Sequence, residues 1–362
     1  MHGGNIHLIH RETGVPVEKI LDFSANINPL GIPGELEQMM AKAMGDVVHY
    51  PDPDYHDLYR ETARFFGCER EHLFLGNGAA AVIHDLIGLL KPKTALLPAP
   101  TFSEYQRALE RCGTEIMYVT LSPANKFDLP VAELLDQLAG IDLLVLCNPN
   151  NPTGRLIPRE DLDKILAECQ KQKCHLLVDE AFMDFIFEEE AVSLLSTIDQ
   201  CTHLTVIRAF TKIFAIPGVR LGAAISGNSR LIHQLRATSI PWNVNTFAAS
   251  IHGYLNTREA DDFLQATREL IKTERMWLAR ELRQFSQLDV IEGRANYLLI
   301  LLKPGNGSTE NLRQALITKG IVIRNCGNYK GLGDGWFRTA VKQRTDNEAL
   351  VNCLREILAE TS

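Results

Sequence analysis

The sequence predicts an α/β fold, in which a mainly parallel sheet is covered by helices on both faces and is followed by a smaller α+β unit. Short, nearly continuous apolar runs such as 141–147 and 175–178 alternate with longer amphipathic stretches in the middle of the chain. Such runs are typical of parallel strands, because helices bury both faces of a parallel sheet. A chain of 362 residues with 45% hydrophobic and 23% charged residues is long enough for two domains with a large core.

The order of the elements follows from the change between strand-like and helix-like periods. We expect helices over residues 54–66, 79–90, 102–111 and 158–172, and strands over 72–75, 94–97, 115–120, 141–147, 175–178, 203–207 and 221–225. A long helix from about 260 to about 285 is followed by strands over 297–302, 321–323 and 336–340 and helices over 309–318 and 347–358. The predicted division is an extended arm over 1–35 that packs on the small domain and the active site, a large domain over 36–255 and a small domain over 256–362.

Composition and charge disfavour several classes of function. A formal net charge of −8 with no basic cluster argues against binding to nucleic acid or to an anionic membrane. No apolar run reaches the roughly 18 residues of a membrane span, and the N-terminus lacks the pattern of a signal peptide. The eight scattered cysteines are expected to be reduced core residues of a cytoplasmic protein. The spacing of His2, His7 and His10 matches no standard metal site, and no metal is expected.

A lysine and an arginine follow one expected strand at a spacing that suits a phosphorylated aldehyde cofactor. Residues 208–222 read RAFTKIFAIPGVRLG, with Lys212 after the strand and Arg220 beside a glycine-containing turn. Pyridoxal phosphate needs an amine that forms an imine, and cations or backbone N–H groups that hold its phosphate. Lys212 can supply the amine and Arg220 the phosphate contact, although a lysine taken alone is more often a surface or ion-paired residue.

Further motifs lie where ligands bind in open α/β sheets, beyond the carboxyl ends of strands. An asparagine of the segment 148–154 (NPNNPTG) can donate to a phenolate oxygen, although such clusters are usually plain turns. Asp179 ends an apolar strand, where it is either a partner for a cationic pyridinium or a helix N-cap. The turn 76–79 (GNGA) opens a helix whose N–H groups can hold phosphate. Phe102 can stack on the pyridine ring or belong to the core.

In this order and at these spacings, the motifs resemble the class I and II aminotransferase family, of the PLP-dependent transferase fold type I, over nearly the whole chain. By that resemblance Lys212 holds pyridoxal 5′-phosphate as a Schiff base, Asp179 pairs with the pyridinium nitrogen and Asn151 binds the phenolic oxygen. The full set implied to contact the cofactor is Tyr50, Gly78, Ala79, Phe102, Asn151, Asp179, Thr211, Lys212 and Arg220. The resemblance also implies a homodimer in which Tyr50 reaches the neighbouring subunit's cofactor phosphate.

Two positions depart from the family pattern. A serine that binds phosphate is usual three residues before the lysine, where this chain has Ala209. A tyrosine that bonds the phenolic oxygen is frequent three residues after the aspartate, where this chain has Phe182. Each change removes one hydroxyl donor, so the cofactor is expected to be held less tightly or tuned differently.

Within the family the chain most resembles the subgroups that act on phosphorylated amino compounds. Segments 2–5 (HGGN), 22–31 (DFSANINPLG), 293–297 (GRANY) and 323–326 (IRNC) bring it closer to decarboxylases of L-threonine-O-3-phosphate than to histidinol-phosphate aminotransferases. Arginine binds carboxylate and phosphate bidentately, and the resemblance implies that Arg338 binds the α-carboxylate and Arg324 the phosphate. The remaining residues implied to contact substrate are His2, Gly3, Gly4, Asn5, Asn28 and Asn151.

The implied reaction is decarboxylation of L-threonine-O-3-phosphate to (R)-1-aminopropan-2-yl phosphate for the nucleotide loop of cobalamin. Decarboxylation of L-serine-O-phosphate to ethanolamine phosphate stays open, because the two substrates differ by one methyl group. Histidinol-phosphate aminotransferase is the alternative within the same fold. A non-catalytic protein that only binds pyridoxal phosphate is the alternative from another class, and the intact lysine, aspartate and arginines argue against it.

Overall fold

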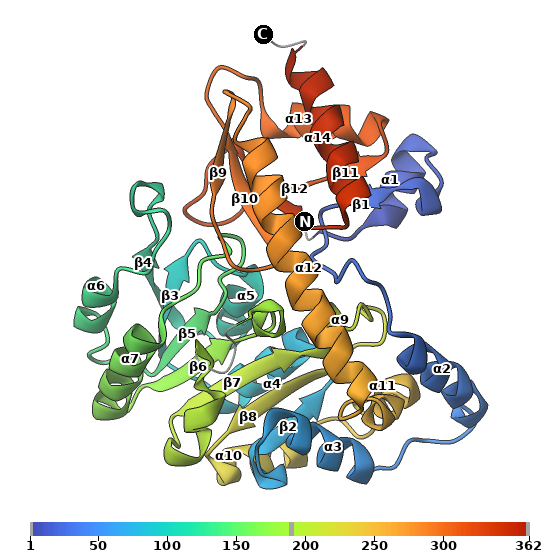
Figure 1. Cartoon of the computed structure of the whole chain (residues 1–362). Helices are drawn as coiled ribbons and strands as arrows, with labels where there is room; N and C mark the ends of the chain where they lie inside the picture. Colours follow the sequence, from blue (N-terminus) through green and yellow to red (C-terminus); the bar gives the residue numbers. More distant parts are fainter. Residues whose placement is uncertain (1–2, 188–191, 360–362) are drawn as a thin grey trace.

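The computed structural model describes residues 3–187 and 192–359, which form three sheets with their helices (Figure 1). The largest sheet has seven strands in the spatial order β2-β8-β7-β6-β5-β3-β4. These strands are β2 (Leu73–Gly76), β3 (Thr94–Ala99), β4 (Glu115–Thr120), β5 (Leu143–Cys147), β6 (His175–Asp179), β7 (Leu204–Ala209) and β8 (Gly222–Ser226). Strand β8 is antiparallel to both of its neighbours and the other pairs are parallel. The expectation of a mainly parallel sheet is confirmed.

Helices cover both faces of this sheet, as the apolar strands require. In β5, Leu144 and Leu146 point to one core, whereas Leu143 and Val145 point to the other, because side chains alternate along a strand. The second of these cores is closed by α4 (Ala79–Leu90), α5 (Ser103–Arg111) and α10 (Ser229–Thr238). The first is closed by α3 (His56–Phe66), α7 (Arg159–Gln172), α11 (Thr246–Ser250) and α12 (Arg258–Leu282).

The C-terminal part is built on a second, antiparallel sheet with the order β12-β13-β10-β9. Its strands are β9 (Leu288–Ile291), β10 (Tyr297–Leu302), β12 (Arg324–Asn325) and β13 (Trp336–Ala340), and its helices are α13 (Thr309–Thr318) and α14 (Arg344–Ala359). Helix α12 runs from the large sheet to this smaller one (Figure 1). The division of the chain at residues 35 and 255 stays a prediction.

The N-terminal segment is not extended throughout, contrary to the expectation from its composition. It contains the helix α1 (Ile6–Thr13), which begins where the Asn5 side chain accepts a hydrogen bond from Leu8 N at 3.1 Å. The helix ends at Gly14, whose φ of +73° suits a left-handed cap. Strand β1 (Leu21–Asp22) then pairs in parallel with β11 (Ile321–Val322), and this segment lies beside α13 and α14 (Figure 1).

Three further α-helices lie in the described residues: α2 (Gly34–Ala43), α6 (Val131–Asp136) and α9 (Phe210–Ile213). The last follows β7 directly and carries Lys212. None of the helices in the ranges 3–187 and 192–359 is both long and apolar enough to span a bilayer.

Candidate active site

Three parallel strands bring the motif residues to one edge of the large sheet. Asp179 is the last residue of β6, the turn that contains Asn151 follows β5, and Lys212 lies in the helix after β7. Because β5, β6 and β7 are neighbours and parallel, their carboxyl ends meet. They open into a cavity of about 550 Å³.

Most of the residues expected at the site line this cavity. They are Gly3, Ala79, Phe102, Asn151, Asp179, Thr211, Lys212, Arg220, Arg324 and Arg338. Ala209 and Phe182, the two departures from the family pattern, line it as well. Residues from the N-terminal segment, the large sheet and the small sheet therefore enclose one space.

The amine of Lys212 lies in an environment that disfavours its charged form. Burial first, and then the nearby guanidinium groups of Arg338 and Arg220, lower the pKa of Lys212 to about 8, against an opposing effect of Asp22. A substantial fraction of the amine is therefore neutral near pH 8, and only the neutral amine can attack a carbonyl carbon.

Asp179 is a buried carboxylate with one donor on each oxygen. Its Oδ2 accepts a hydrogen bond from Tyr105 Oη at 2.6 Å, and its Oδ1 accepts one from Ala181 N at 2.9 Å. Burial raises the pKa of Asp179, and both hydrogen bonds oppose that rise. Sequence reasoning found Asp179 but missed Tyr105, although its place three residues after Phe102 could have pointed to the same helix end.

A glycine and an arginine lie against each other at the start of α4, and the arginine lines the cavity. Gly78 caps this helix with φ +84°, and a Cβ there would lie 2.3 Å from Arg220 Nη2. Only glycine leaves room for the guanidinium against the helix N-terminus. Free N–H groups, the helix dipole and a guanidinium together favour an anion at this end.

At the other end, two arginines lie opposite each other on antiparallel strands. Arg324 on β12 is directly paired with Arg338 on β13. Arg338 donates to Asn151 Oδ1 at 2.5 Å and to Ser24 O at 2.9 Å. Arg324 donates to Asn325 O, and at 2.8 Å to Asn328 Oδ1. Each of these arginines thus uses two of its five N–H donors in these bonds.

Tyr329 is a second cavity residue that the sequence did not reveal. It lies in the loop between β12 and β13, and its Oη donates to Asn151 Oδ1 at 3.3 Å. The amide oxygen of Asn151 therefore receives both Tyr329 and Arg338, and the amide nitrogen is left to serve as a donor. No motif spacing marked Tyr329, because only the folded loop carries it to the large sheet.

Several expected residues lie elsewhere. The Asn28 amide donates to Ile213 O at 2.7 Å and to Thr267 Oγ1 at 2.8 Å, and it is Asn26 that lines the cavity. The Asn26 side-chain oxygen is buried and has no hydrogen-bond partner among the described residues. Tyr50 is 77% exposed and stacks on Trp242 with ring centroids 4.3 Å apart, outside the cavity of its own chain.

The N-terminal glycine segment lies at the border of a second cavity, of about 660 Å³, between α1 and the small sheet. Gly3, Ser24 and Arg324 line both cavities, and Asn5 lines only the second. Gly4 N donates to Ser24 Oγ at 2.8 Å. His2 lies outside the described residues.

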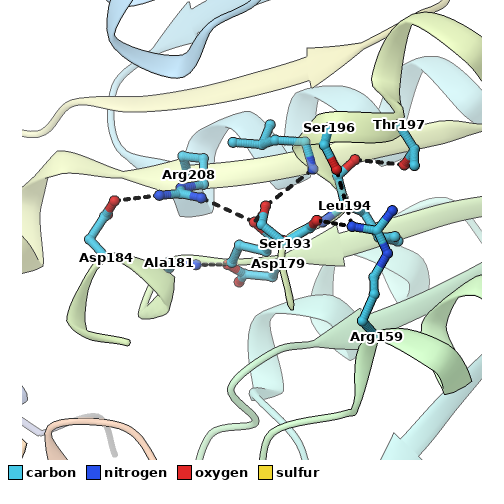
Figure 2. A network of polar contacts seen from close by, with 11 residues as sticks. Arg159, Asp179, Ala181, Asp184, Ser193, Leu194, Ser196, Thr197 and Arg208 are labelled. Carbon is cyan, nitrogen blue, oxygen red and sulfur yellow. Dashed lines mark hydrogen bonds and ion pairs between the residues drawn. The ribbon is translucent and has the colours of Figure 1, made fainter. Parts of the chain in front are cut away.

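A buried ion-pair network lies directly behind Asp179 (Figure 2). Glu180 Oε2 accepts from Arg208 Nη1 at 3.1 Å and from Ser193 Oγ at 2.6 Å, and Arg208 also pairs with Asp184. Both carboxylates and the guanidinium are almost fully buried. Such a network fixes the turn that follows β6 and thereby the backbone of Asp179.

The cavity fits a flat, phosphorylated pyridine. The described groups that shift the pKa of Asp179 include no cation, so this buried carboxylate suits a cationic ring nitrogen. An amine with a lowered pKa lies at Lys212, and Arg220, which approaches Gly78 at the start of α4, lines the same cavity. Phe102, at the start of α5, offers an aromatic face.

Comparisons with known proteins agree with this chemistry. Residues 18–354 match the family model described as aminotransferase class I and II. The chain is 36% identical over 357 residues to a threonine-phosphate decarboxylase of Salmonella typhimurium, covering 99% of this chain and 96% of that protein. It is 32% identical over 365 residues to an adenosylcobalamin biosynthesis bifunctional protein of Leptospira interrogans, covering 99% of this chain and 41% of that protein. The crystal structure of the histidinol-phosphate aminotransferase from Clostridium acetobutylicum superposes with a TM-score of 0.87 at 28% identity, over 93% of this chain and 99% of that chain.

Proposed function

The chain belongs to the aminotransferase class I and II family and uses pyridoxal 5′-phosphate, and from that premise we propose that it is a decarboxylase of L-threonine-O-3-phosphate. The products are CO2 and (R)-1-aminopropan-2-yl phosphate, an intermediate for the nucleotide loop of cobalamin. Similarity over nearly the full length of a threonine-phosphate decarboxylase, and to part of a bifunctional protein of adenosylcobalamin biosynthesis, supports this assignment.

The residues that would hold the cofactor line the cavity or border it at the start of α4. Lys212 would bind it covalently, Asp179 would pair with its ring nitrogen and the amide nitrogen of Asn151 would donate to its phenolic oxygen. The proposed phosphate contacts are Gly78, Ala79, Thr211 and Arg220, and Phe102 covers the ring. When bound, the cofactor supplies an electron sink for the bond that breaks at the substrate's Cα.

The observation that carries the proposed substrate is the pair Arg324 and Arg338 on one face of the cavity. Neighbours directly across two antiparallel strands have their side chains on the same face. A phospho-amino acid has two anionic groups, and one guanidinium is available for each. We assign the α-carboxylate to Arg338, which is already bonded to Asn151, and the phosphate to Arg324, which borders the N-terminal glycines.

The residues of this chain orient the substrate and move one proton. Arg338 fixes the direction of the carboxylate, but it must not stabilise the ground state more than the transition state, or the loss of CO2 is slowed. The amine of Lys212, with its pKa lowered to about 8, can carry a proton to Cα after CO2 leaves. Asp179 would balance the positive charge of the cofactor's ring nitrogen.

We further propose that the enzyme is a homodimer in which Tyr50 completes the neighbouring subunit's cofactor site. Tyr50 stacks on Trp242, and exposed large apolar side chains flank both residues in the sequence. They are Met44, Val47 and Val48 before Tyr50, and Ile240 beside the exposed Trp242. Exposed apolar side chains of this kind favour a protein partner. The cytoplasmic location expected from the sequence stays a prediction.

The experiment that tests the proposed reaction compares three substrates in the absence of any 2-oxo acid. Purified holoenzyme is incubated with L-threonine-O-3-phosphate, L-serine-O-phosphate or histidinol phosphate while CO2 and the cofactor's absorbance are followed. Continued CO2 release from threonine phosphate supports the decarboxylase. No CO2, together with conversion of the cofactor to its amine form by histidinol phosphate, would instead support the aminotransferase.

The choice between threonine and serine phosphate rests on one methyl group. A pocket gains about 1–3 kcal/mol from such a group, which corresponds to roughly a 10- to 200-fold difference in kcat/KM. The ratio of kcat/KM for the two substrates therefore identifies the preferred one, and a ratio near one would mean that the enzyme accepts both.

A further inference from the structure

Tyr105 makes a short, fully buried hydrogen bond to Asp179. Its side chain has no exposed surface, and its Oη lies 2.6 Å from Asp179 Oδ2. Hydroxyl-to-carboxylate bonds of this length are charge-assisted and are about twice as strong as neutral ones. The bond joins α5 to the end of β6, and its two residues are 74 positions apart in sequence.

The same helix end carries Phe102, the proposed cover of the cofactor ring. Phe102 is the residue that precedes α5, and Tyr105 follows in its first turn. Their rings meet edge to face with centroids 5.6 Å apart and planes at 82°. One short segment therefore positions both the aromatic face and the hydroxyl donor of Asp179.

The groups that face Asp179 from the packed elements are neutral. They are Tyr105 from α5, Cys147 from β5 and Tyr297 from β10, and burial raises the pKa of each above its ordinary value. Burial also raises the pKa of Asp179 itself, opposed first by the Tyr105 hydroxyl and then by Ala181 N. Among the described side chains that act on Asp179, the hydroxyl of Tyr105 is therefore the one that favours its charged form.

We propose that Tyr105 is a positioning residue that fixes the Asp179 carboxylate and keeps it ionised, so that the shared proton stays on the cofactor's ring nitrogen. This inference rests on the cofactor and on the assignment of Asp179, which belong to the proposed function, and not on which substrate is decarboxylated. Without the hydroxyl, the carboxylate becomes the stronger base and draws the proton from the ring.

The decisive readout is the protonation of the ring nitrogen in substrate-free holoenzyme. Apoenzyme is loaded with pyridoxal phosphate labelled with ¹⁵N in the ring, and the nitrogen chemical shift is measured for wild type and Tyr105→Phe. We expect the protonated fraction to fall in the variant and the dissociation constant of the cofactor to rise about tenfold or more, as for loss of a hydrogen bond to a charged group.

Two matched variants separate positioning from general stability. Tyr55→Phe removes another buried hydroxyl, which donates to Val244 O at 2.9 Å outside the cavity, and it should leave the ¹⁵N shift unchanged. In an Asp179→Asn background, Tyr105→Phe should weaken cofactor binding no further, because its partner charge is already gone.

A third variant keeps the test decisive if Tyr105→Phe fails to fold. Replacement of Tyr105 by 3-fluorotyrosine retains the ring and makes the hydroxyl a stronger donor, so the protonated fraction should be maintained or increased. An unchanged ¹⁵N shift in Tyr105→Phe, or a fall in the protonated fraction with 3-fluorotyrosine, would overturn the proposal. Because no substrate is present, either result is independent of the reaction catalysed.

Discussion

Arg324 and Arg338 are directly opposite each other on β12 and β13, and both line the cavity that contains Lys212. Two like charges held on one face require anionic partners, and the described contacts of these arginines are to uncharged oxygens of Ser24, Asn151, Asn325 and Asn328. A small substrate with two anionic groups satisfies this arrangement.

The first prediction separates the two arginines. Arg324→Ala should raise KM for phosphorylated substrates about 10- to 100-fold, because it removes a hydrogen-bonded charge pair worth roughly 1.5–3 kcal/mol. The control is Arg313→Ala. Arg313 pairs with Glu310 and lines the second cavity but not the one that contains Lys212. Steady-state kinetics provide the measurement, and an unchanged KM for Arg324→Ala would remove this residue from the phosphate site.

The second prediction concerns the pH dependence of cofactor attachment. Because the neutral amine reacts, the rate at which apoenzyme binds pyridoxal phosphate covalently should rise with pH and level off above about 8, the lowered pKa of Lys212. Arg338→Gln removes one cation that lowers this pKa, so the midpoint should move to higher pH. Stopped-flow absorbance measures the rate. A wild-type midpoint near the ordinary lysine pKa of 10.5 would contradict the burial of the amine.

The third prediction tests the close approach of Gly78 and Arg220. Gly78→Ala places a Cβ 2.3 Å from Arg220 Nη2 at a positive φ, so the guanidinium must move and cofactor affinity should fall at least tenfold. Gly88→Ala in the same helix meets open space and should instead stabilise the protein by up to about 1 kcal/mol. Fluorescence titration of each apoenzyme with the cofactor measures its affinity. Equal cofactor affinities of Gly78→Ala and Gly88→Ala would argue against a phosphate site at the start of this helix.

The fourth prediction concerns the network behind Asp179. Arg208→Ala leaves Glu180 and Asp184 buried without their guanidinium and should lower the free energy of unfolding by about 3–5 kcal/mol. Arg60→Ala removes an exposed arginine that pairs with Asp57 and should cost about 1 kcal/mol or less. Denaturant unfolding of both apoenzymes measures the difference, and losses of equal size would mean that the buried pairs do not hold this turn.

The fifth prediction tests whether Tyr50 acts on the neighbouring subunit. Tyr50→Ala and Lys212→Ala subunits should each be weakly active or inactive alone. Each mixed dimer of the two contains one site with an intact Lys212 and an intact Tyr50. Because random refolding of an equal mixture makes half of the dimers mixed, activity should return to about a quarter of the wild-type level. Activity is assayed after unfolding and refolding the mixture. Failure to recover activity in proven mixed dimers would place Tyr50 outside the neighbouring site.

The elements that bring the candidate site residues together were predictable because local patterns determine them. The apolar strands β5, β6 and β7 place Asn151, Asp179 and Lys212 at or just after three adjacent strand ends, and parallel pairing brings those ends together. The glycine turn before α4 was predictable for the same reason, since Gly78 has a backbone conformation that other residues rarely adopt.

The remaining site residues depend on tertiary structure and left no local pattern. Tyr329 reaches Asn151 only because a loop of the small sheet crosses to the large one, and Tyr105 meets Asp179 across 74 residues. Asn28 resembles a site residue by its motif, yet its amide is bonded within the fold and Asn26 faces the cavity instead. The helix α1 was missed because a polar segment with glycines resembles an arm until Asn5 and Gly14 are recognised as its caps.

The measurement that tests the proposed function most directly is the number of CO2 molecules released per active site from L-threonine-O-3-phosphate, with pyridoxal phosphate as the only added cofactor and no 2-oxo acid present. A decarboxylase regenerates its cofactor in each cycle, so we predict many CO2 molecules per site and no loss of activity when glutamate and 2-oxoglutarate are withheld. Lys212→Ala serves as the inactive reference. No CO2 beyond that reference, with turnover only when an amino donor and an acceptor are supplied together, would contradict the proposed decarboxylase.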